Sequence, residues 1–175
     1  MKRAEIDLAH LAFLPVRDWQ KRWFLLASGD FASGVYNFMT VAWGGLGCMW
    51  ERPLAMIVVR PTRYTYEFLE KYPDFTLCQF PKEYSKQLAW CGAHSGRKVD
   101  KVKHTGLTPM AGRLAAAPVF AEAELALECR KIYWNDLQPA NFLAGYIESH
   151  YPEKDYHRVF FGEILAAAGT AAYQG

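Results

Sequence analysis

The chain lacks the phosphate-binding signatures of the common nucleotide-binding folds. It contains neither a G-x-G-x-x-G run nor a G-x-x-x-x-G-K-[ST] run, which excludes a Rossmann-type or P-loop site. It also has no G-x-S-x-G turn, so a hydrolase with a nucleophile elbow is excluded. Its four cysteines form no C-x-x-C pair, and we therefore expect neither a metal site nor dithiol redox chemistry.

A strong charge of one sign and a long hydrophobic run are missing as well. The formal net charge is +2 and the 20 basic residues are spread along the chain, which argues against a nucleic-acid partner. No apolar stretch approaches the roughly 20 residues of a membrane span, and residues 1–10 lack the apolar core of a secretion signal. With few cysteines, these absences indicate a cytoplasmic protein without a membrane partner.

Aromatic residues, by contrast, are plentiful. The 175 residues are 51% hydrophobic and 15% aromatic, which is enough to build a sizeable core within one domain spanning residues 1–175. So many aromatic side chains indicate either a large core or an apolar surface that a partner subunit covers.

The pattern of apolar runs and turn residues predicts mainly β structure. Strands are expected in a run ending at 28–30 and at 36–43, 54–60, 75–80, 121–134 and 157–168; helices at 64–72, 81–91 and 95–105; connections at 44–47 and 135–156, the latter with a helical turn near 142–150. The alanine and glutamate content of 121–134 also suits a helix. Strand and helix do not alternate regularly, which argues against a doubly wound parallel sheet. We therefore predict a mainly antiparallel β-barrel with inserted helices.

The run Arg60-Pro61-Thr62-Arg63-Tyr64-Thr65 follows an apolar strand and precedes a helix. Its two arginines supply fixed forks of hydrogen-bond donors. We expect Thr65 to cap the helix, so that the first amides and the positive end of the dipole point outward. These groups suit a phosphate. The alternative is a surface loop with solvated arginines.

A second cationic cluster lies at Ser95-Gly96-Arg97-Lys98-Val99-Asp100-Lys101. With Ser95 as the cap of a helix, Arg97, Asp100 and Lys101 share one face, and Gly96 lets a ligand approach backbone amides. The alternative is an ordinary capped helix with an internal ion pair. Two cationic helix starts in one small domain favour an anion site.

The strand predicted at 36–43 mixes polar and apolar side chains. On one face lie Asn37, Met39, Val41 and Trp43, and on the other lie Phe38, Thr40 and Ala42. A flat heteroaromatic ligand needs this combination of backbone donors and acceptors along an edge, a polar amide and apolar walls. Ordinary barrel core is the alternative. His94, His104 and His157 are candidate acid–base groups, although a lone histidine is more often structural.

Taken in order along the chain, these segments resemble the flavin reductase-like, FMN-binding split β-barrel family, whose well-known members include the flavoredoxins. The matching pieces are Asn37-x-Met39-Thr40-x-x-Trp43-Gly44, Val59-Arg60-Pro61-x-Arg63-Tyr64-Thr65, Phe75-Thr76-Leu77, Cys91-Gly92-x-x-Ser95-Gly96-Arg97-x-x-Asp100-Lys101, Gly106-Leu107-Thr108-Pro109 and Tyr156-His157-Arg158-x-Phe160-x-Gly162-Glu163-Ile164. They cover most of residues 22–165. The resemblance implies a homodimer of antiparallel split barrels with one FMN per subunit, near the dimer interface.

The same resemblance implies roles for individual residues. The backbone around residues 39–43 edges the isoalloxazine ring, while the phosphate is held by Arg60, Arg63 and Thr65, helped by Ser95, Gly96 and Lys101. The expected cofactor-binding set is Asn37, Met39, Thr40, Val41, Ala42, Trp43, Arg60, Arg63, Tyr64, Thr65, Ser95, Gly96, Arg97 and Lys101. No catalytic side chain is assigned, because the hydride chemistry belongs to the flavin.

The resulting hypothesis is an FMN-dependent oxidoreductase of the flavin reductase type that passes hydride from NADH or NADPH to flavin. One alternative is a non-enzymatic FMN-binding carrier that exchanges electrons with a redox partner protein. The other is a cofactor-free structural dimer on the same fold, which FMN would not stabilise.

Overall fold

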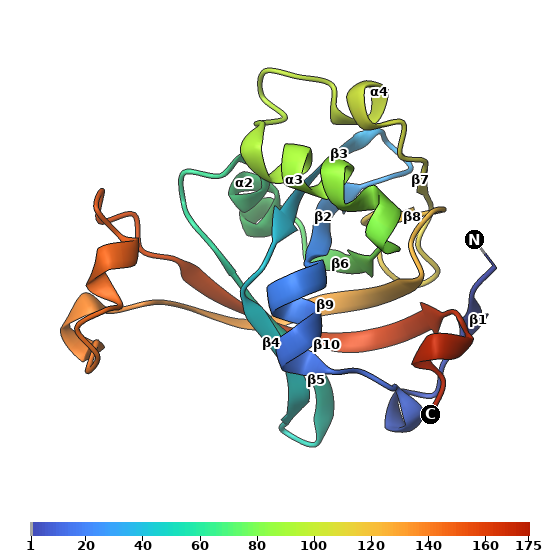
Figure 1. The fold of residues 1–175 in the computed structure, drawn as a ribbon, viewed down its shortest axis with the longest axis horizontal. Helices are drawn as coiled ribbons and strands as arrows, with labels where there is room; N and C mark the ends of the chain where they lie inside the picture. The colour runs from blue at the N-terminus through green and yellow to red at the C-terminus, as the bar shows by residue number, and fades with distance from the viewer. Residues whose placement is uncertain (1) are drawn as a thin grey trace.

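The computed structural model describes residues 2–175, and one antiparallel sheet dominates it (Figure 1). The sheet strands are β1 (Ala4–Glu5), β2 (Phe24–Asp30), β3 (Val35–Val41), β4 (Gly44–Met49), β5 (Arg52–Val59), β6 (Asp74–Gln79), β9 (Leu125–Asp136) and β10 (Arg158–Gly169). Their order is β3-β2-β6-β9-β10-β5-β4, with β1 pairing β10. A separate two-stranded sheet joins β7 (Pro109–Met110) to β8 (Val119–Phe120). The predicted mainly antiparallel β fold is confirmed.

Short helices connect the strands. They are α1 (Pro15–Arg17), α2 (Tyr64–Lys71), α3 (Ser85–Ala93) and α4 (Lys101–Thr105), the π-helix η2 (Asp18–Arg22), and the 3-10 turns η1 (Leu8–His10), η3 (Lys82–Tyr84), η4 (Pro139–Asn141), η5 (Glu148–His150) and η6 (Ala171–Tyr173). Figure 1 shows α3 lying beside β3 and the β9–β10 connection extending away from the body of the sheet. No helix within residues 2–175 is both long and apolar enough to cross a membrane.

Two hydrophobic clusters form the core, and alternation along the strands separates them. In β2, Leu26 belongs to the first cluster, with Phe75 and Phe160, while its neighbour Leu25 belongs to the second. The second cluster also includes Leu88 from α3. Because adjacent side chains on a strand point to opposite faces, β2 can anchor both clusters, and α3 is held against the sheet by the second.

The connection expected at 44–47 is instead strand β4, which pairs with β5 from Gly44↔Ile57 to Gly47↔Leu54. Its glycines carry no side chains that could show strand alternation, so the sequence pattern resembles a flexible link. At Gly44 an added Cβ would overlap the Met56 carbonyl and the Trp19 ring. Glycine is therefore required here by close approach rather than by flexibility.

The helix expected at 95–105 is shorter, because α4 begins at Lys101. Its cap is Asp100, whose Oδ1 accepts a hydrogen bond from the Lys103 amide at 3.0 Å. Ser95 caps only a turn, where its Oγ accepts from the Arg97 amide at 3.3 Å. The predicted end at Gly106 is confirmed, with a left-handed φ of 69°. Residues 95–100 therefore form a loop, and no helix face gathers their charges.

The helix expected at 81–91 divides into η3 and α3, and α3 continues through Gly92 to Ala93. The helix expected at 64–72 matches α2. The strands expected at 54–60 and 75–80 match β5 and β6. Their ends agree to within one residue, except that β5 begins two residues earlier than expected. The strand expected at 121–134 is confirmed over the helix alternative, although β9 lies later, at Leu125–Asp136. In the long connection, helical turns form at η4 and η5.

The four cysteines differ sharply in exposure. Cys48, on β4, is exposed, whereas Cys78, Cys91 and Cys129 are buried. Burial raises the pKa of Cys78 to about 12, so this thiol is inert at neutral pH. All four are unpaired in the structure.

Candidate functional site

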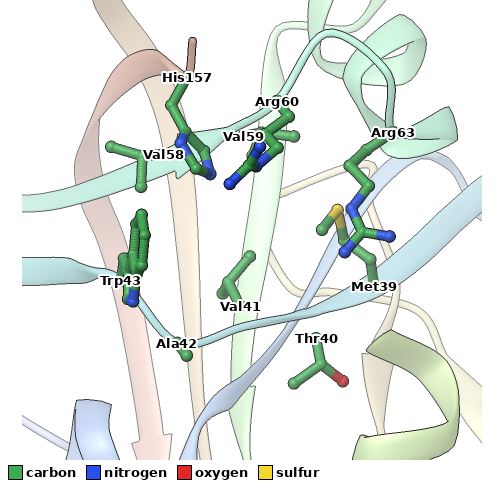
Figure 2. A pocket seen from close by; sticks show the side chains of 10 residues that line it. All are labelled: Met39, Thr40, Val41, Ala42, Trp43, Val58, Val59, Arg60, Arg63 and His157. Atoms are coloured by element: carbon green, nitrogen blue, oxygen red, sulfur yellow. The ribbon is translucent and has the colours of Figure 1, made fainter. Parts of the chain in front are cut away.

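Two adjoining cavities lie between the end of β3 and the start of α2. The larger, of about 210 Å³, is lined by Met39, Thr40, Val41, Ala42, Trp43, Val58, Val59, Arg60, Arg63 and His157 (Figure 2). The smaller, of about 60 Å³, is lined by Asn37, Met39, Thr62, Arg63, Tyr64, Thr65, Cys91, Gly92, His94, Ser95, Gly96 and Lys101. Met39 and Arg63 line both, so the two cavities form one candidate site.

The expected site residues on β3 reach the cavities as the strand leaves the sheet. Met39 and Val41 also pack in the first core cluster, as their shared face predicts, while Phe38 packs in the second. Thr40 is anchored to α3, because its Oγ1 donates to the Leu88 carbonyl at 2.5 Å. After Val41 the chain is no longer paired as β3, so the stretch ending at Trp43 offers unpaired backbone along the larger cavity.

Arg63 lies where the two cavities meet, at the N-cap position of α2. Figure 2 shows its side chain directed toward Met39. Within residues 2–175, its guanidinium makes no hydrogen bond or ion pair. An uncompensated guanidinium on a cavity wall, next to a helix N-terminus, is suited to an anion.

Thr65 does not cap the helix, contrary to the sequence prediction. The helix α2 begins at Tyr64, so Thr65 lies within the first turn, and its side chain is buried. Its Oγ1 accepts a hydrogen bond of 2.8 Å from the Asn37 side-chain amide. The two residues therefore tie α2 to β3 on the wall of the smaller cavity.

The 95–100 loop closes the smaller cavity from the other side. An added Cβ on Gly96 would overlap the Asn37 Oδ1, so the loop passes too close for a larger residue. At its end Lys101, only 5% exposed, donates to the carbonyls of Phe38 at 2.6 Å and Cys91 at 3.1 Å. Burial, opposed in part by Cys91, lowers the pKa of Lys101 to about 8, because desolvation disfavours its charged form.

Arg97, expected in the site, lies outside both cavities. Its guanidinium pairs with Glu67 of α2 and stacks over the Tyr64 ring, with 4.8 Å between the guanidinium carbon and the ring centroid. Residues 95–100 do not form the helix that was expected to place Arg97 beside Lys101, so the structure does not bring Arg97 together with the other expected site residues.

Arg60 lines the larger cavity and is absent from the lining of the smaller one. It forms an ion pair with Asp155, donates to the His150 carbonyl at 2.7 Å, and stacks over the Tyr151 ring. Its charge is therefore balanced within the chain, in contrast to Arg63. The sequence predicts phosphate-binding donors at both arginines and does not distinguish between them.

His157 is absent from the cofactor-binding set predicted from the sequence, yet it lines the larger cavity. Its Nδ1 lies 2.9 Å from the Tyr151 hydroxyl, and its ring centroid lies 5.2 Å from that of Trp43. Burial, with help from the Arg60 charge, lowers the pKa of His157 to about 4 and keeps the ring neutral at pH 7. The available signal was the polar run 155–158 before an apolar strand. Val58, Val59, Thr62, Cys91, Gly92 and His94 were also missed as lining residues.

The described residues contain no group of three or more His, Cys, Asp or Glu side chains arranged to hold a metal ion. The chemistry of the site therefore consists of one uncompensated cation and a buried ammonium near the smaller cavity, and of backbone, apolar walls and a neutral imidazole around the larger one.

The sequence model of the flavin reductase like domain matches residues 23–171. No curated protein matches the chain.

Solved structures with the same fold include three informative ones. Flavoredoxin of Desulfovibrio vulgaris (Miyazaki F) is 25% identical, with a TM-score of 0.67 over 93% of this chain and 73% of its own. An FMN-binding domain of a flavin reductases-like enzyme from Shewanella baltica OS155 is 18% identical, with a TM-score of 0.71 over 99% and 83%. The Streptomyces globisporus C-1027 NADH:FAD oxidoreductase SgcE6 is 20% identical, with a TM-score of 0.65 over 93% and 79%. Since the family model covers most of the chain, this protein belongs to the flavin reductase-like domain family.

Proposed function

We propose that the candidate site binds FMN and that the protein is an oxidoreductase of the flavin reductase type, with NADH or NADPH as hydride donor. The observation that carries this proposal is Arg63, a cation without a protein partner in residues 2–175 at the junction of the two cavities. When bound, FMN supplies the hydride acceptor, so the chain itself needs no acid–base pair.

The residues of the smaller cavity fit a phosphate. Arg63 and the Ser95 hydroxyl are donors on its wall, and the first turn of α2 begins beside them. Lys101 has three ammonium protons, of which two are used by carbonyls, so one remains for an anion. Asn37 and Thr65 hold this wall in place through their own hydrogen bond.

The residues of the larger cavity fit a planar ring. The backbone of residues 39–43 supplies hydrogen-bonding groups along one edge, and Val58 and Val59 supply an apolar face. Arg60 adds no net charge here, because Asp155 balances it. The role of these residues is to orient the ring and to exclude water from it.

A homodimer is part of the proposal. At about 210 Å³ the larger cavity is smaller than the roughly 300–1,000 Å³ typical of ligand sites, so a further wall would complete it. Trp43, at its edge, is 45% exposed, and Trp50, Tyr133 and Trp134 are also exposed. Exposed aromatic residues of this size are typical of surfaces that another subunit covers.

The unpaired cysteines support a reducing, cytoplasmic setting.

An absorption spectrum of the purified protein, followed by titration with FMN, tests the proposal. We expect a flavin spectrum that changes on binding, and NADH or NADPH oxidation that depends on FMN. A protein that neither perturbs the FMN spectrum nor gains thermal stability from FMN contradicts the proposal and supports a cofactor-free structural dimer.

An FMN-binding electron carrier is the second candidate, favoured by the structural likeness to flavoredoxin at 25% identity. It predicts a flavin that stays bound during gel filtration and is reduced slowly by NADH and NADPH but rapidly by a redox partner protein. Steady NADH or NADPH oxidation with free FMN favours the flavin reductase instead.

A further inference from the structure

The β9–β10 connection, residues 137–157, folds back onto the larger cavity through several side chains. Asp155 pairs with Arg60, and the Tyr151 ring lies under the Arg60 guanidinium, 5.0 Å from its central carbon. His150 and His157 both contact the Trp43 ring, with centroid distances of 5.3 and 5.2 Å. The His157 ring also contacts the Tyr151 ring, with 5.5 Å between the two centroids.

The hydrogen bond between Tyr151 and His157 has a direction that the surroundings determine. Tyr151 is only 4% exposed, and its hydroxyl has one proton to donate. Among the described residues, His157 Nδ1, at 2.9 Å, is the acceptor available to the hydroxyl proton. A proton on Nδ1 would leave a buried O–H without an acceptor, which is costly.

The other ring nitrogen, Nε2, then carries the proton of the neutral ring. Burial, and next the charge of Arg60, keep the ring neutral by lowering the pKa of His157 to about 4. Within residues 2–175, Nε2 has no hydrogen-bond partner. In the described part of the chain, the buried side-chain atoms without a hydrogen-bond partner belong to Trp19 and Gln87. Nε2 is not among them, so it is accessible, and its ring lines the larger cavity (Figure 2).

We propose that Tyr151 is a positioning residue that holds His157 in the Nε2–H tautomer, so that His157 donates a hydrogen bond to a carbonyl oxygen of the ring bound in the larger cavity. The identity of that ring rests on the proposed function. Both a flavin and the carboxamide of a nicotinamide present such an oxygen at the edge of a planar system. The tautomer itself depends only on residues of this chain.

Nitrogen-15 NMR of the flavin-free protein tests the tautomer directly, with the His157 signals assigned by their loss in His157→Gln. We expect Nδ1 to show the shift of an unprotonated nitrogen and Nε2 that of a protonated one at pH 7. Tyr151→Phe removes only the hydroxyl, and we expect it to give a mixture of the two tautomers. The exposed Tyr146 provides the matched control, because Tyr146→Phe should leave the His157 signals unchanged.

A wild-type spectrum with the proton on Nδ1 overturns the proposal, as does a Tyr151→Phe spectrum identical to that of the wild type. The wild-type measurement alone decides the tautomer, so poor folding of a variant does not block the test. It is also independent of FMN, so that a failure of FMN binding and a failure of this inference are observed separately.

Ligand titrations then identify the acceptor. If His157 donates to the flavin, Tyr151→Phe should raise the Kd of FMN about threefold to tenfold and shift its absorption bands. If it donates to nicotinamide, the KM for NADH should rise by a similar factor while the Kd of FMN stays constant. Both effects should vanish when Tyr151→Phe is made in the His157→Gln background. If Tyr151→Phe changes neither quantity, the donor role is wrong.

Discussion

At the scale of single residues, the three arginines of the candidate region differ in whether a neighbour balances their charge. Arg60 is paired with Asp155 and Arg97 with Glu67, whereas Arg63 makes no such pair within residues 2–175. A paired arginine must give up a partner to bind a ligand, and an unpaired one need not. The sequence shows all three as equivalent cations, and only their surroundings distinguish them.

We expect Arg63→Ala to weaken FMN binding about tenfold, which corresponds to about 1.4 kcal/mol. The effect is modest because Arg63 is exposed to solvent, which screens its charge. Fluorescence titration of FMN measures it. Arg97→Ala is the matched control and should leave the Kd unchanged. Equal effects from the two substitutions would contradict the assignment of Arg63.

His157 should make stability depend on pH. Its pKa is about 4 in the folded chain and about 6.5 when unfolded, so the unfolded chain binds more protons between these values. Stability is therefore fully present above pH 6.5 and decreases as the pH falls toward 4. We expect this group to lower the free energy of unfolding by about 2 kcal/mol over this pH range. This is less than the full pKa shift corresponds to, because the ring borders an open cavity where solvent screens its charge.

Urea unfolding at a series of pH values measures this effect, with His157→Gln as the comparison. The variant should show a shallower loss of stability between pH 6.5 and 4. Parallel curves for the two proteins would mean that His157 does not titrate as its surroundings require.

At the scale of structural elements, the site depends on how closely the 95–100 loop approaches β3. We expect Gly96→Ala to destabilise the fold by about 1–3 kcal/mol, because its Cβ overlaps Asn37 Oδ1 and disturbs the bond to Thr65. Gly47→Ala is the control, since a Cβ there meets no atom within 4 Å. Thermal unfolding measures both, and equal Tm values would show that the loop yields without cost.

The sequence predicted the elements whose signals are local. An apolar run ended by Pro61 marked β5, Pro73 follows the end of α2, and Gly106 marked the end of α4. The glycine-rich strand β4 was missed, since its pairing with β5 is visible only in the backbone. The start of α4 was misplaced because Ser95 and Asp100 are both competent caps, and tertiary contacts of Lys101 decide between them.

The candidate site was predictable to the extent that it is contiguous in sequence. Residues 39–43 and 62–65 form two short continuous segments, and each segment lines the cavities along its length. The contacts of Tyr151 and Asp155 with Arg60 could not be predicted, because they join the β9–β10 connection to a residue about 90 positions earlier in the chain. Long-range contacts of this kind leave no periodic signal.

At the scale of the whole molecule, ligand binding and folding are linked. With FMN at 100 times its Kd, we expect the folded state to gain about 2.7 kcal/mol. For a chain of this length, that gain raises the Tm by roughly 5–10 °C. Differential scanning fluorimetry with FMN, and with riboflavin as the control without phosphate, measures it. An equal shift from both ligands would argue against a phosphate site beside Arg63.

The difference in exposure among the cysteines allows one of them to be labelled selectively. Because Cys48 lies exposed on β4 while the other three thiols are buried, a maleimide dye should attach at one defined position without unfolding the chain. Energy transfer between differently labelled copies would then report the distance between two edge strands, and so reveal self-association directly in dilute solution.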